Sequence, residues 1–400
     1  MKINGKITIT GSKSETNRLL MLQALSSHAF EILNTSNSKD SQVMREALTS
    51  KEKKINIGIA GTAMRFLTAY FAVKENREII LTGEGRMLER PIGILVDALN
   101  NLGSEISYVN KLGFPPLRIK GKKITKNKVE IPADISSQYI TALMLIAPFL
   151  ENGLTICLKG KITSIPYIKM TKGLLNRVGI DCIFKENKIE IKSSVLSEET
   201  QTVESDWSSA SYYYSLSAIS EGGEISLASY REDSLQGDKK LITIYKRFGV
   251  ESKFQGNQLV LRKKENFQPP EFILLDLNNT PDIAQTIAVT CTALKIKCKL
   301  TGLATLKIKE TDRLEALKTE LTKFGVEVFI TEDSLEILNF KKTQQNIVVK
   351  TYHDHRMAMA FAPLKLYYDF VIEDQKVVEK SYPDFWKDLE KLNIIFNETS

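Results

Sequence analysis

The chain has 400 residues, of which 42% are hydrophobic and 26% are charged, and it carries a formal net charge of +7 at pH 7. This length and composition indicate a globular protein with two or three domains and a sizeable core. The positive charge is spread along the sequence instead of forming a basic tail, which argues against a nucleic-acid partner and suits a small acidic substrate.

The cysteines, histidines and apolar runs argue against a metalloprotein, a secreted protein and a membrane-spanning protein. The 4 cysteines form no C-x-x-C pair and the 3 histidines are too few for a rich metal site, so we expect no bound metal and a reducing compartment. Residues 1–6 lack the apolar core of a signal peptide, and the longest apolar run, residues 141–150, is too short to span a bilayer. These features predict a cytoplasmic protein with no membrane partner.

The first predicted elements are a strand, a turn and a helix. Residues 7–10 alternate Ile and Thr, which is typical of a half-buried strand. Gly11 tolerates a positive φ, a following serine can cap, and apolar residues from Leu19 onward recur at helical spacing. Backbone N–H groups, the helix dipole, Lys13 and Arg18 would then converge and bind an anion. A capped helix with two solvated cations is the alternative interpretation.

The same strand, turn and helix recur along the chain. Four of the five separations between predicted helix starts lie between 72 and 74 residues, the starts being Ser14, Thr62, Ser136, Ser208, Pro281 and Asp354. Thr280 before Pro281 is a strong helix-start signal. Helix ends are predicted at residues that tolerate the left-handed conformation: Gly103, Gly179, Gly249, Gly325 and Asn393.

This regularity predicts an α/β architecture built by duplication from six units, with two domains of three units and a first unit trimmed around residues 51–54. If the marked helices run parallel, their positive N-terminal ends line a cleft suited to a substrate with several negative charges. A non-enzymatic repeat scaffold is the alternative. The residues at the helix starts are more reactive than simple caps require: Lys13, Arg18, Gln138, Asp206, Asp282, His355 and Arg356.

Six short motifs follow one another in order, and each alone is weak evidence. The two densely charged stretches, residues 86–91 and 309–313, are individually more typical of solvated turns. The six motifs are GSKS at 11–14 with Asn17 and Arg18, AGTAMR at 60–65, RMLERPIG at 86–93, SSQ at 136–138, KETDR at 309–313 and DHRMA at 354–358. Together, over residues 5–392, the chain resembles the 5-enolpyruvylshikimate-3-phosphate (EPSP) synthase family.

The resemblance implies two domains, each an inside-out α/β barrel of three βαβαββ units. We expect one domain over residues 14–204 and the other over residues 1–13 plus 205–400, with the active site in the cleft between them and hinge closure on substrate. The implied reaction moves the enolpyruvyl group of phosphoenolpyruvate to the 5-hydroxyl of shikimate-3-phosphate by addition and elimination through a tetrahedral intermediate, releasing phosphate. It is the penultimate step of chorismate, and so of aromatic amino acid, biosynthesis.

The resemblance also implies site residues, because two phosphates and two carboxylates must be held together. Phosphoenolpyruvate is expected at Lys13, Gly61, Arg90, Gln138, Arg313, Arg356 and Lys380. Shikimate-3-phosphate is expected at Lys13, Ser14, Arg18, Ser136, Ser137, Gln138, Ser164, Tyr167, Asp282, Thr305 and Lys309. Our hypothesis is that Asp282 takes the hydroxyl proton, Glu310 handles the methyl proton and Lys13 assists at the bridging oxygen. A pure helix cap is the alternative for Asp282.

No cofactor is called for, the partners are the two small substrates, and we expect a monomer. The family is the target of the herbicide glyphosate, which occupies the phosphoenolpyruvate site, and Gly61 suggests sensitivity. Three positions depart from the family pattern: Ile59 replaces Asn, Phe66 replaces Pro and Thr305 replaces Asn. The first two could shift the helix that carries Gly61, whose missing side chain lets phosphoenolpyruvate approach the backbone.

Rival functions remain open at this point. The sister enzyme that acts on UDP-N-acetylglucosamine uses a loop cysteine, and none lies between Gly61 and Pro91. A catalytically inactive anion-binding homologue is a second rival. The sequence His353-Asp354-His355 could be a metal triad, but Arg356 would repel the cation. The interpretation as a serine hydrolase has even less support, because the sequence has no G-x-S-x-G elbow.

Overall fold

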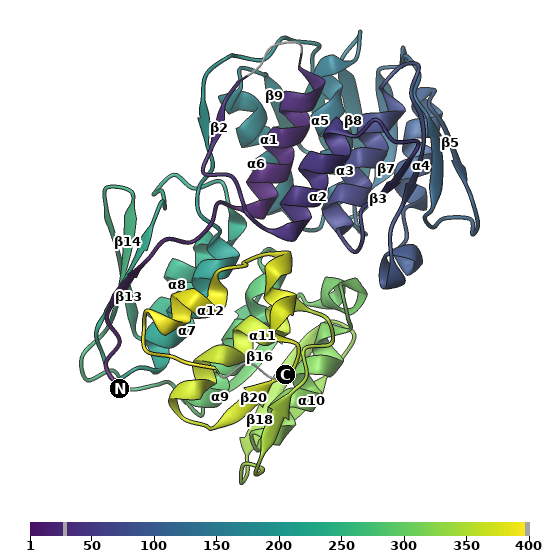
Figure 1. Ribbon diagram of the computed structural model, residues 1–400. Helices are drawn as coiled ribbons and strands as arrows, with labels where there is room; N and C mark the ends of the chain where they lie inside the picture. Colours follow the sequence, from purple (N-terminus) through teal and green to yellow (C-terminus); the bar gives the residue numbers. More distant parts are fainter. Residues whose placement is uncertain (27–29, 397–400) are drawn as a thin grey trace. The chain divides into compact units, whose positions relative to one another are not determined.

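The computed structural model describes residues 1–26 and 30–396 and has a mixed α/β fold (Figure 1). The chain divides into two compact units. The N-terminal unit is Gly11–Val203, and the C-terminal unit combines Met1–Thr10 with Glu204–Ser400. The sequence-based bounds, at residues 14 and 205, differ from these by a few positions.

The N-terminal unit contains two four-stranded sheets with the same plan. In each, the first two strands are parallel and the last two form an antiparallel hairpin. One sheet has the order β3 (Lys54–Asn56), β4 (Glu78–Thr82), β6 (Leu117–Lys120), β5 (Glu105–Tyr108). The other has β7 (Lys128–Pro132), β8 (Leu154–Lys159), β10 (Lys188–Ile191), β9 (Cys182–Lys185). A third sheet is a parallel pair, β11 (Gln201–Thr202) with β2 (Ile32–Leu33).

The C-terminal unit follows the same plan. Its sheets are β1 (Gly5–Ile7), β12 (Glu224–Ala228), β14 (Gln258–Lys263), β13 (Val250–Gln255), and then β15 (Phe272–Asp276), β16 (Lys297–Thr301), β18 (Ser334–Phe340), β17 (Val326–Ile330). A parallel pair, β19 (Ile347–Val349) with β20 (Phe370–Ile372), completes it. The first strand of the chain belongs here because Gly5 pairs in parallel register with Ile225, so the chain leaves this unit after Thr10 and returns at Glu204.

Central helices fill each unit. The N-terminal unit has α1 (Lys13–Leu25), α2 (Lys39–Thr49), α3 (Gly61–Ala72), α4 (Gly93–Leu102), α5 (Ser137–Ile146) and α6 (Ile165–Arg177). Helices α1, α3 and α5 contact one another. Almost every residue of α3 and α5 is buried, as expected for helices that are apolar all round and lie in a core. The N-terminal ends of these helices carry the motifs GSKS, AGTAMR and SSQ.

The C-terminal unit has α7 (Trp207–Ile219), α8 (Leu241–Lys246), α9 (Ala284–Ala293), α10 (Arg313–Lys323), α11 (His355–Phe361) and α12 (Phe385–Glu390). Helix α9 contacts both α7 and α11, and the three are largely buried. Short 3-10 turns connect these elements to the strands, notably η4 (Pro281–Ile283), η5 (Ala304–Ile308) and η7 (Gln375–Lys380). Asp282 lies in η4 and Lys380 in η7, whereas Lys309 and Glu310 lie between η5 and α10, and Arg313 and Arg356 lie at the starts of α10 and α11.

Most predicted helix ends are confirmed. The four end glycines have φ values between 76° and 112°, and Asn393 has a φ of 60°.

Two predictions at helix starts turn out differently. The φ of Gly11 is not positive, and a Cβ there would lie 1.8 Å from the Asn34 carbonyl oxygen. Close backbone approach therefore requires this glycine. The Thr280 prediction is wrong for the side chain: it forms no cap hydrogen bond, and its hydroxyl has no partner among the described residues.

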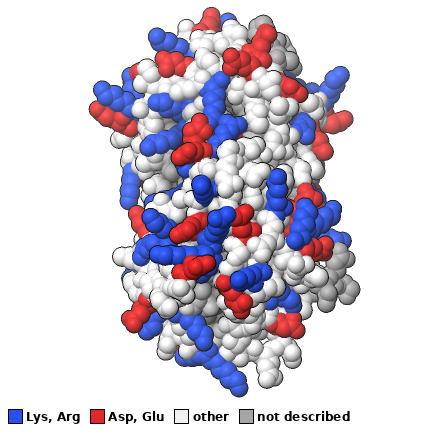
Figure 2. All heavy atoms as spheres, turned by 90° about the vertical axis from the view of Figure 1, so that its left-hand side faces the viewer, with Lys and Arg blue, Asp and Glu red and all other residues white. Residues whose placement is uncertain are grey.

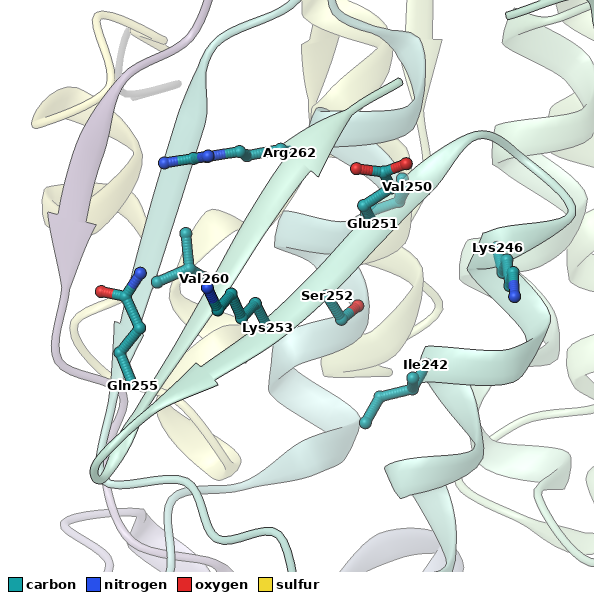
Figure 3. A pocket seen from close by; sticks show the side chains of 9 residues that line it. All are labelled: Ile242, Lys246, Val250, Glu251, Ser252, Lys253, Gln255, Val260 and Arg262. Atoms are coloured by element: carbon teal, nitrogen blue, oxygen red, sulfur yellow. The ribbon is translucent and has the colours of Figure 1, made fainter.

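The surface includes a pocket that lies apart from the predicted site residues. Lys, Arg, Asp and Glu are interspersed over the face of each unit that Figure 2 presents. A pocket of about 490 Å³ in the C-terminal unit is lined by residues of α8, β13 and β14, with Lys246 and Arg262 at opposite sides of it (Figure 3). No predicted site residue lines this pocket. Within residues 1–26 and 30–396, no helix combines the length and apolar character that crossing a bilayer requires.

Candidate active site

Helix α1 begins with Lys13, directly after its N-cap Ser12, whose hydroxyl accepts a hydrogen bond from the Glu15 backbone N–H. The Lys13 ammonium donates to Asp40 of α2 at 3.0 Å. Sequence reasoning missed Asp40, which lies 27 positions further along the chain. The contact fixes the Lys13 side chain at the helix start, where the dipole already favours an anion.

Arg18 lies about one turn further along α1 and is 3% exposed. Its Nε donates to the Thr171 hydroxyl and its Nη1 to the Ser14 carbonyl, each at 2.8 Å. Its Cζ lies 5.3 Å from the ring centre of Phe66 and 5.9 Å from that of Tyr167. Burial lowers the pKa of Arg18 to about 10, so it remains cationic at neutral pH. Among the described residues, no carboxylate forms an ion pair with it.

Gly61 is the first residue of α3, and no side chain caps this helix start. A Cβ atom on Gly61 would lie 2.3 Å from Nη1 and 2.8 Å from Cζ of Arg90. The missing side chain therefore admits the Arg90 guanidinium, which adds to the expectation that it admits phosphoenolpyruvate. Uncapped N–H groups beside a guanidinium form an anion-binding point.

Arg65 holds the segment that carries Arg90. Its guanidinium donates to the Pro91 carbonyl at 2.8 Å and to the Gly61 carbonyl at 3.2 Å, and the Tyr139 hydroxyl donates to the same Pro91 carbonyl at 2.6 Å. Burial first, and then the charge of Arg90, lower the pKa of Arg65 to about 10. Sequence analysis gave Arg65 no role, because it acts through neighbours and not at an exposed helix start.

The serine-rich motif lies at the start of α5. Ser136 is the N-cap and accepts from the Gln138 N–H at 3.3 Å, Ser137 is buried, and the Gln138 amide donates to the Thr62 hydroxyl at 3.3 Å. Ser164, with a φ of 52°, precedes α6, and its carbonyl accepts from the Tyr167 N–H. Because α1, α5 and α6 contact one another, the predicted shikimate-3-phosphate residues of this unit lie on mutually packed helices.

Arg313 organises the second group of residues, in the C-terminal unit. It is 1% exposed, and its guanidinium contacts Asp282 at 2.9 Å, Glu310 at 2.9 Å and Asp354 at 2.6 Å. Burial alone would lower the pKa of Arg313, but the carboxylates of Asp354, Glu310 and Asp282 outweigh it and raise the pKa. Asp354 is fully buried and also accepts from the Arg356 N–H, so it joins α11 to Arg313.

The two predicted acid-base residues are each held by further cations. Asp282, in η4, lies 3.5 Å from Lys309 and 3.6 Å from Arg356. Glu310 contacts Lys380 of η7 at 2.8 Å. Ion pairs thus join all the site residues predicted from this unit except Thr305. That residue lies in η5, and its buried hydroxyl has no partner among the described residues.

Three further side chains bear on the site: Asp238, His353 and His355. Asp238 is buried and accepts from the Ser208 hydroxyl at 2.5 Å. Burial, followed by the charge of Asp282, raises the pKa of Asp238 to about 7. The two histidines of the alternative metal triad lie in different surroundings, since the side chain of His353 is 91% exposed and that of His355 only 2%. A shared metal between them is therefore not supported.

Comparison with known proteins identifies the fold and the family. In structure, the chain is similar to EPSP synthase of Acinetobacter baumannii, with a TM-score of 0.77 at 20% identity over 98% of this chain and 96% of that one, which establishes the fold. The EPSP synthase (3-phosphoshikimate 1-carboxyvinyltransferase) family model matches residues 1–50 and 47–389.

Curated relatives extend the match. A 3-phosphoshikimate 1-carboxyvinyltransferase of Bacteroides fragilis is 43% identical over 98% of this chain and 95% of its own length. One from Colwellia psychrerythraea is 36% identical over 98% of this chain and 97% of its own length. The fold and site thus define an enolpyruvyl-transferase type of enzyme. The chain belongs to the EPSP synthase family.

Proposed function

We propose that this chain transfers the enolpyruvyl group of phosphoenolpyruvate to the 5-hydroxyl of shikimate-3-phosphate and releases phosphate. The observation that carries the proposal is a contrast between two kinds of arginine. Arg18 and Arg90 have no ion pair with a carboxylate of the described chain, whereas Arg313 contacts three. Arginines without a carboxylate suit the phosphates and carboxylates of substrates, and the carboxylate-rich cluster suits proton transfer.

Binding roles follow from the local geometry. Arg90, beside the uncapped start of α3, takes an anionic group of phosphoenolpyruvate together with Gln138. Arg313, Arg356 and Lys380 contact the same substrate while they also hold the carboxylates of Asp282 and Glu310. Shikimate-3-phosphate is held by the α1, α5 and α6 starts, through Ser14, Arg18, Ser136, Ser137, Ser164 and Tyr167, and by Lys309. Thr305 offers a hydroxyl that finds no partner in the described part of the chain, and we assign it to the same substrate.

The reaction needs one group that accepts the hydroxyl proton. It needs a second group that first donates a proton to the methylene carbon and then takes it back. The 5-hydroxyl oxygen forms a bond to the central enol carbon as its proton passes to Asp282, while the methylene carbon takes a proton from Glu310. The resulting tetrahedral intermediate then expels phosphate, Lys13 donates to the bridging oxygen, and the methyl group returns its proton to Glu310. Ion pairs with Arg313 and other cations hold both carboxylates in place before substrate binds.

Further proposals concern the repeat architecture, the compartment, the oligomeric state and the cofactor. Each unit has two four-stranded sheets and one parallel pair, and this repetition supports three βαβαββ-type repeats arranged as an inside-out barrel in each unit, with the first repeat trimmed around residues 51–54. We further propose a cytoplasmic monomer that uses no cofactor and acts on small molecules only. The site proposed for the reaction uses residues of both units, so each unit alone is expected to be inactive.

The direct test measures phosphate released when purified protein is mixed with both substrates and no added metal. Prompt release that requires both substrates supports the proposal. Without release from folded protein, UDP-N-acetylglucosamine is offered in place of shikimate-3-phosphate, because the sister reaction is the rival activity. Failure with both acceptors, combined with intact binding of shikimate-3-phosphate, would indicate the inactive homologue.

A further inference from the structure

Phe66 is a position at which the sequence analysis expects a departure from the family pattern, and the structure places an arginine beside it. Its ring is completely buried, and the ring centre lies 5.3 Å from Cζ of Arg18. Tyr167 approaches the same Cζ, with its ring centre at 5.9 Å. These two rings come from α3 and α6, and the guanidinium they contact comes from α1.

Arg18 depends on such support more than most arginines. It is almost completely buried, and among the described residues no carboxylate forms an ion pair with it, although the charge of the buried Glu15 carboxylate on the same helix favours its cationic form. Its polar contacts inside the protein are a hydroxyl of Thr171 and the carbonyl of Ser14. A desolvated guanidinium gains substantially from aromatic faces, since water no longer competes for it. The two rings therefore help to hold the charge in place until an anion reaches it.

Phe66 and its neighbour Arg65 serve different arginines. Successive residues of a helix point about 100° apart, so adjacent side chains reach different surroundings. Arg65 contacts the Gly61 and Pro91 carbonyls beside Arg90, whereas Phe66 contacts Arg18. The sequence-based expectation placed the effect of Phe66 on phosphoenolpyruvate, through the helix that carries Gly61. The contacts favour an effect on the other substrate.

We propose that Phe66 is a positioning residue for Arg18: with Tyr167, its ring holds the guanidinium in the orientation that binds an anionic group of shikimate-3-phosphate. This inference rests on the proposed function. Phe66 does not touch substrate in this account. It sets the affinity for shikimate-3-phosphate and leaves that for phosphoenolpyruvate nearly unchanged.

The test compares Phe66→Leu with Phe71→Leu. Phe71 is on the same helix and is also buried, at 3% exposed, but its ring contacts Tyr70 instead of an arginine. For Phe66→Leu we expect the Kd and KM for shikimate-3-phosphate to rise about 5- to 30-fold, the range of a buried cation–π contact, with the KM for phosphoenolpyruvate changed less than about twofold. Phe71→Leu should lose comparable thermal stability and leave both constants unchanged.

Two additions keep the test decisive. If Phe66→Leu does not fold, Phe66→Met fills the volume without a ring and should give the same selective loss. In an Arg18→Lys background, the effect of Phe66→Leu should shrink, since a lysine ammonium lacks the planar face that stacks on a ring.

The outcomes separate this inference from the proposed function. Wild-type protein that neither binds shikimate-3-phosphate nor releases phosphate overturns both. Active wild-type protein with an unchanged constant in Phe66→Leu, or with a loss that falls on phosphoenolpyruvate instead, overturns the positioning role alone. A loss of equal size in Phe71→Leu would show a general packing effect and would also overturn it.

Discussion

The Arg90 guanidinium occupies the space that a side chain on residue 61 would need, since a Cβ there would lie 2.3 Å from Nη1 of Arg90. Real Cβ atoms do not approach a neighbour so closely, so the guanidinium must move when residue 61 gains a side chain. The glycine of the AGTAMR motif and the arginine of the RMLERPIG motif therefore form one structural unit, although 29 positions of sequence separate residues 61 and 90.

Gly61→Ala should therefore weaken phosphoenolpyruvate binding through Arg90. Losing one well-aligned charge-assisted contact predicts a rise in KM of about 10-fold or more, with a smaller effect on shikimate-3-phosphate. Steady-state kinetics with each substrate varied in turn measures this. Gly93→Ala is the matched control, because Gly93 also begins a helix but its Cβ would meet nothing closer than 3.4 Å. An unchanged KM in Gly61→Ala would contradict the role given to Arg90.

Arg65→Lys should also weaken phosphoenolpyruvate binding, because it loosens the segment that carries Arg90. Lysine cannot bridge the Gly61 and Pro91 carbonyls as the planar guanidinium does, so the segment carrying Arg90 loses one of its anchors. We expect a stability loss of about 1–3 kcal/mol together with a higher KM for phosphoenolpyruvate. Denaturant unfolding and kinetics measure the two effects. A stability loss without any change in KM would show that Arg65 supports the fold but not the position of Arg90.

Asp282→Asn tests the proposed base. The amide keeps the size of the side chain but accepts no proton, so kcat should fall about 100-fold or more. Both substrates should still bind, which calorimetry of each substrate alone would measure. Asp276→Asn is the control, because that exposed carboxylate at the end of β15 accepts only a local backbone hydrogen bond from Asn278. Turnover at the normal rate with intact binding would reject the base assignment and leave Asp282 with the structural role of its ion pairs.

The raised pKa of Asp238 predicts that the stability of the protein depends on pH. Its pKa is raised from 3.8 to about 7, by burial first and by the charge of Asp282 second, although the Ser208 hydroxyl and Arg356 oppose the rise. Between these two pKa values the folded state binds more protons than the unfolded state, so this residue's contribution to stability falls as pH rises from about 4 to 7.

Asp238→Asn removes that contribution. The variant should therefore gain stability relative to wild type as pH rises, by an amount on the order of 1–3 kcal/mol between about pH 4 and pH 8. Thermal midpoints of both proteins across this range measure the difference. A constant difference between the two proteins at all pH values would show that Asp238 does not titrate there.

The local sequence determined the helix starts and ends of this protein. Ser12, Ser136, Asp206 and Asp354 all act as side-chain N-caps, and the predicted end glycines do take the left-handed conformation. These features depend on residues within one turn of each other, so neighbouring letters suffice to predict them. The ordered motifs, in turn, were sufficient to place the chain in its family.

Tertiary structure alone decided which residues support the site. Asp40 beside Lys13, Arg65 beside Pro91, Asp354 beside Arg313 and Phe66 beside Arg18 had no signal in the local pattern. Each pair joins elements separated by 26 to 48 positions. Periodicity and capping report only on neighbours along one helix or strand, whereas these contacts arise from the packing of several elements, which decides what each buried charge meets.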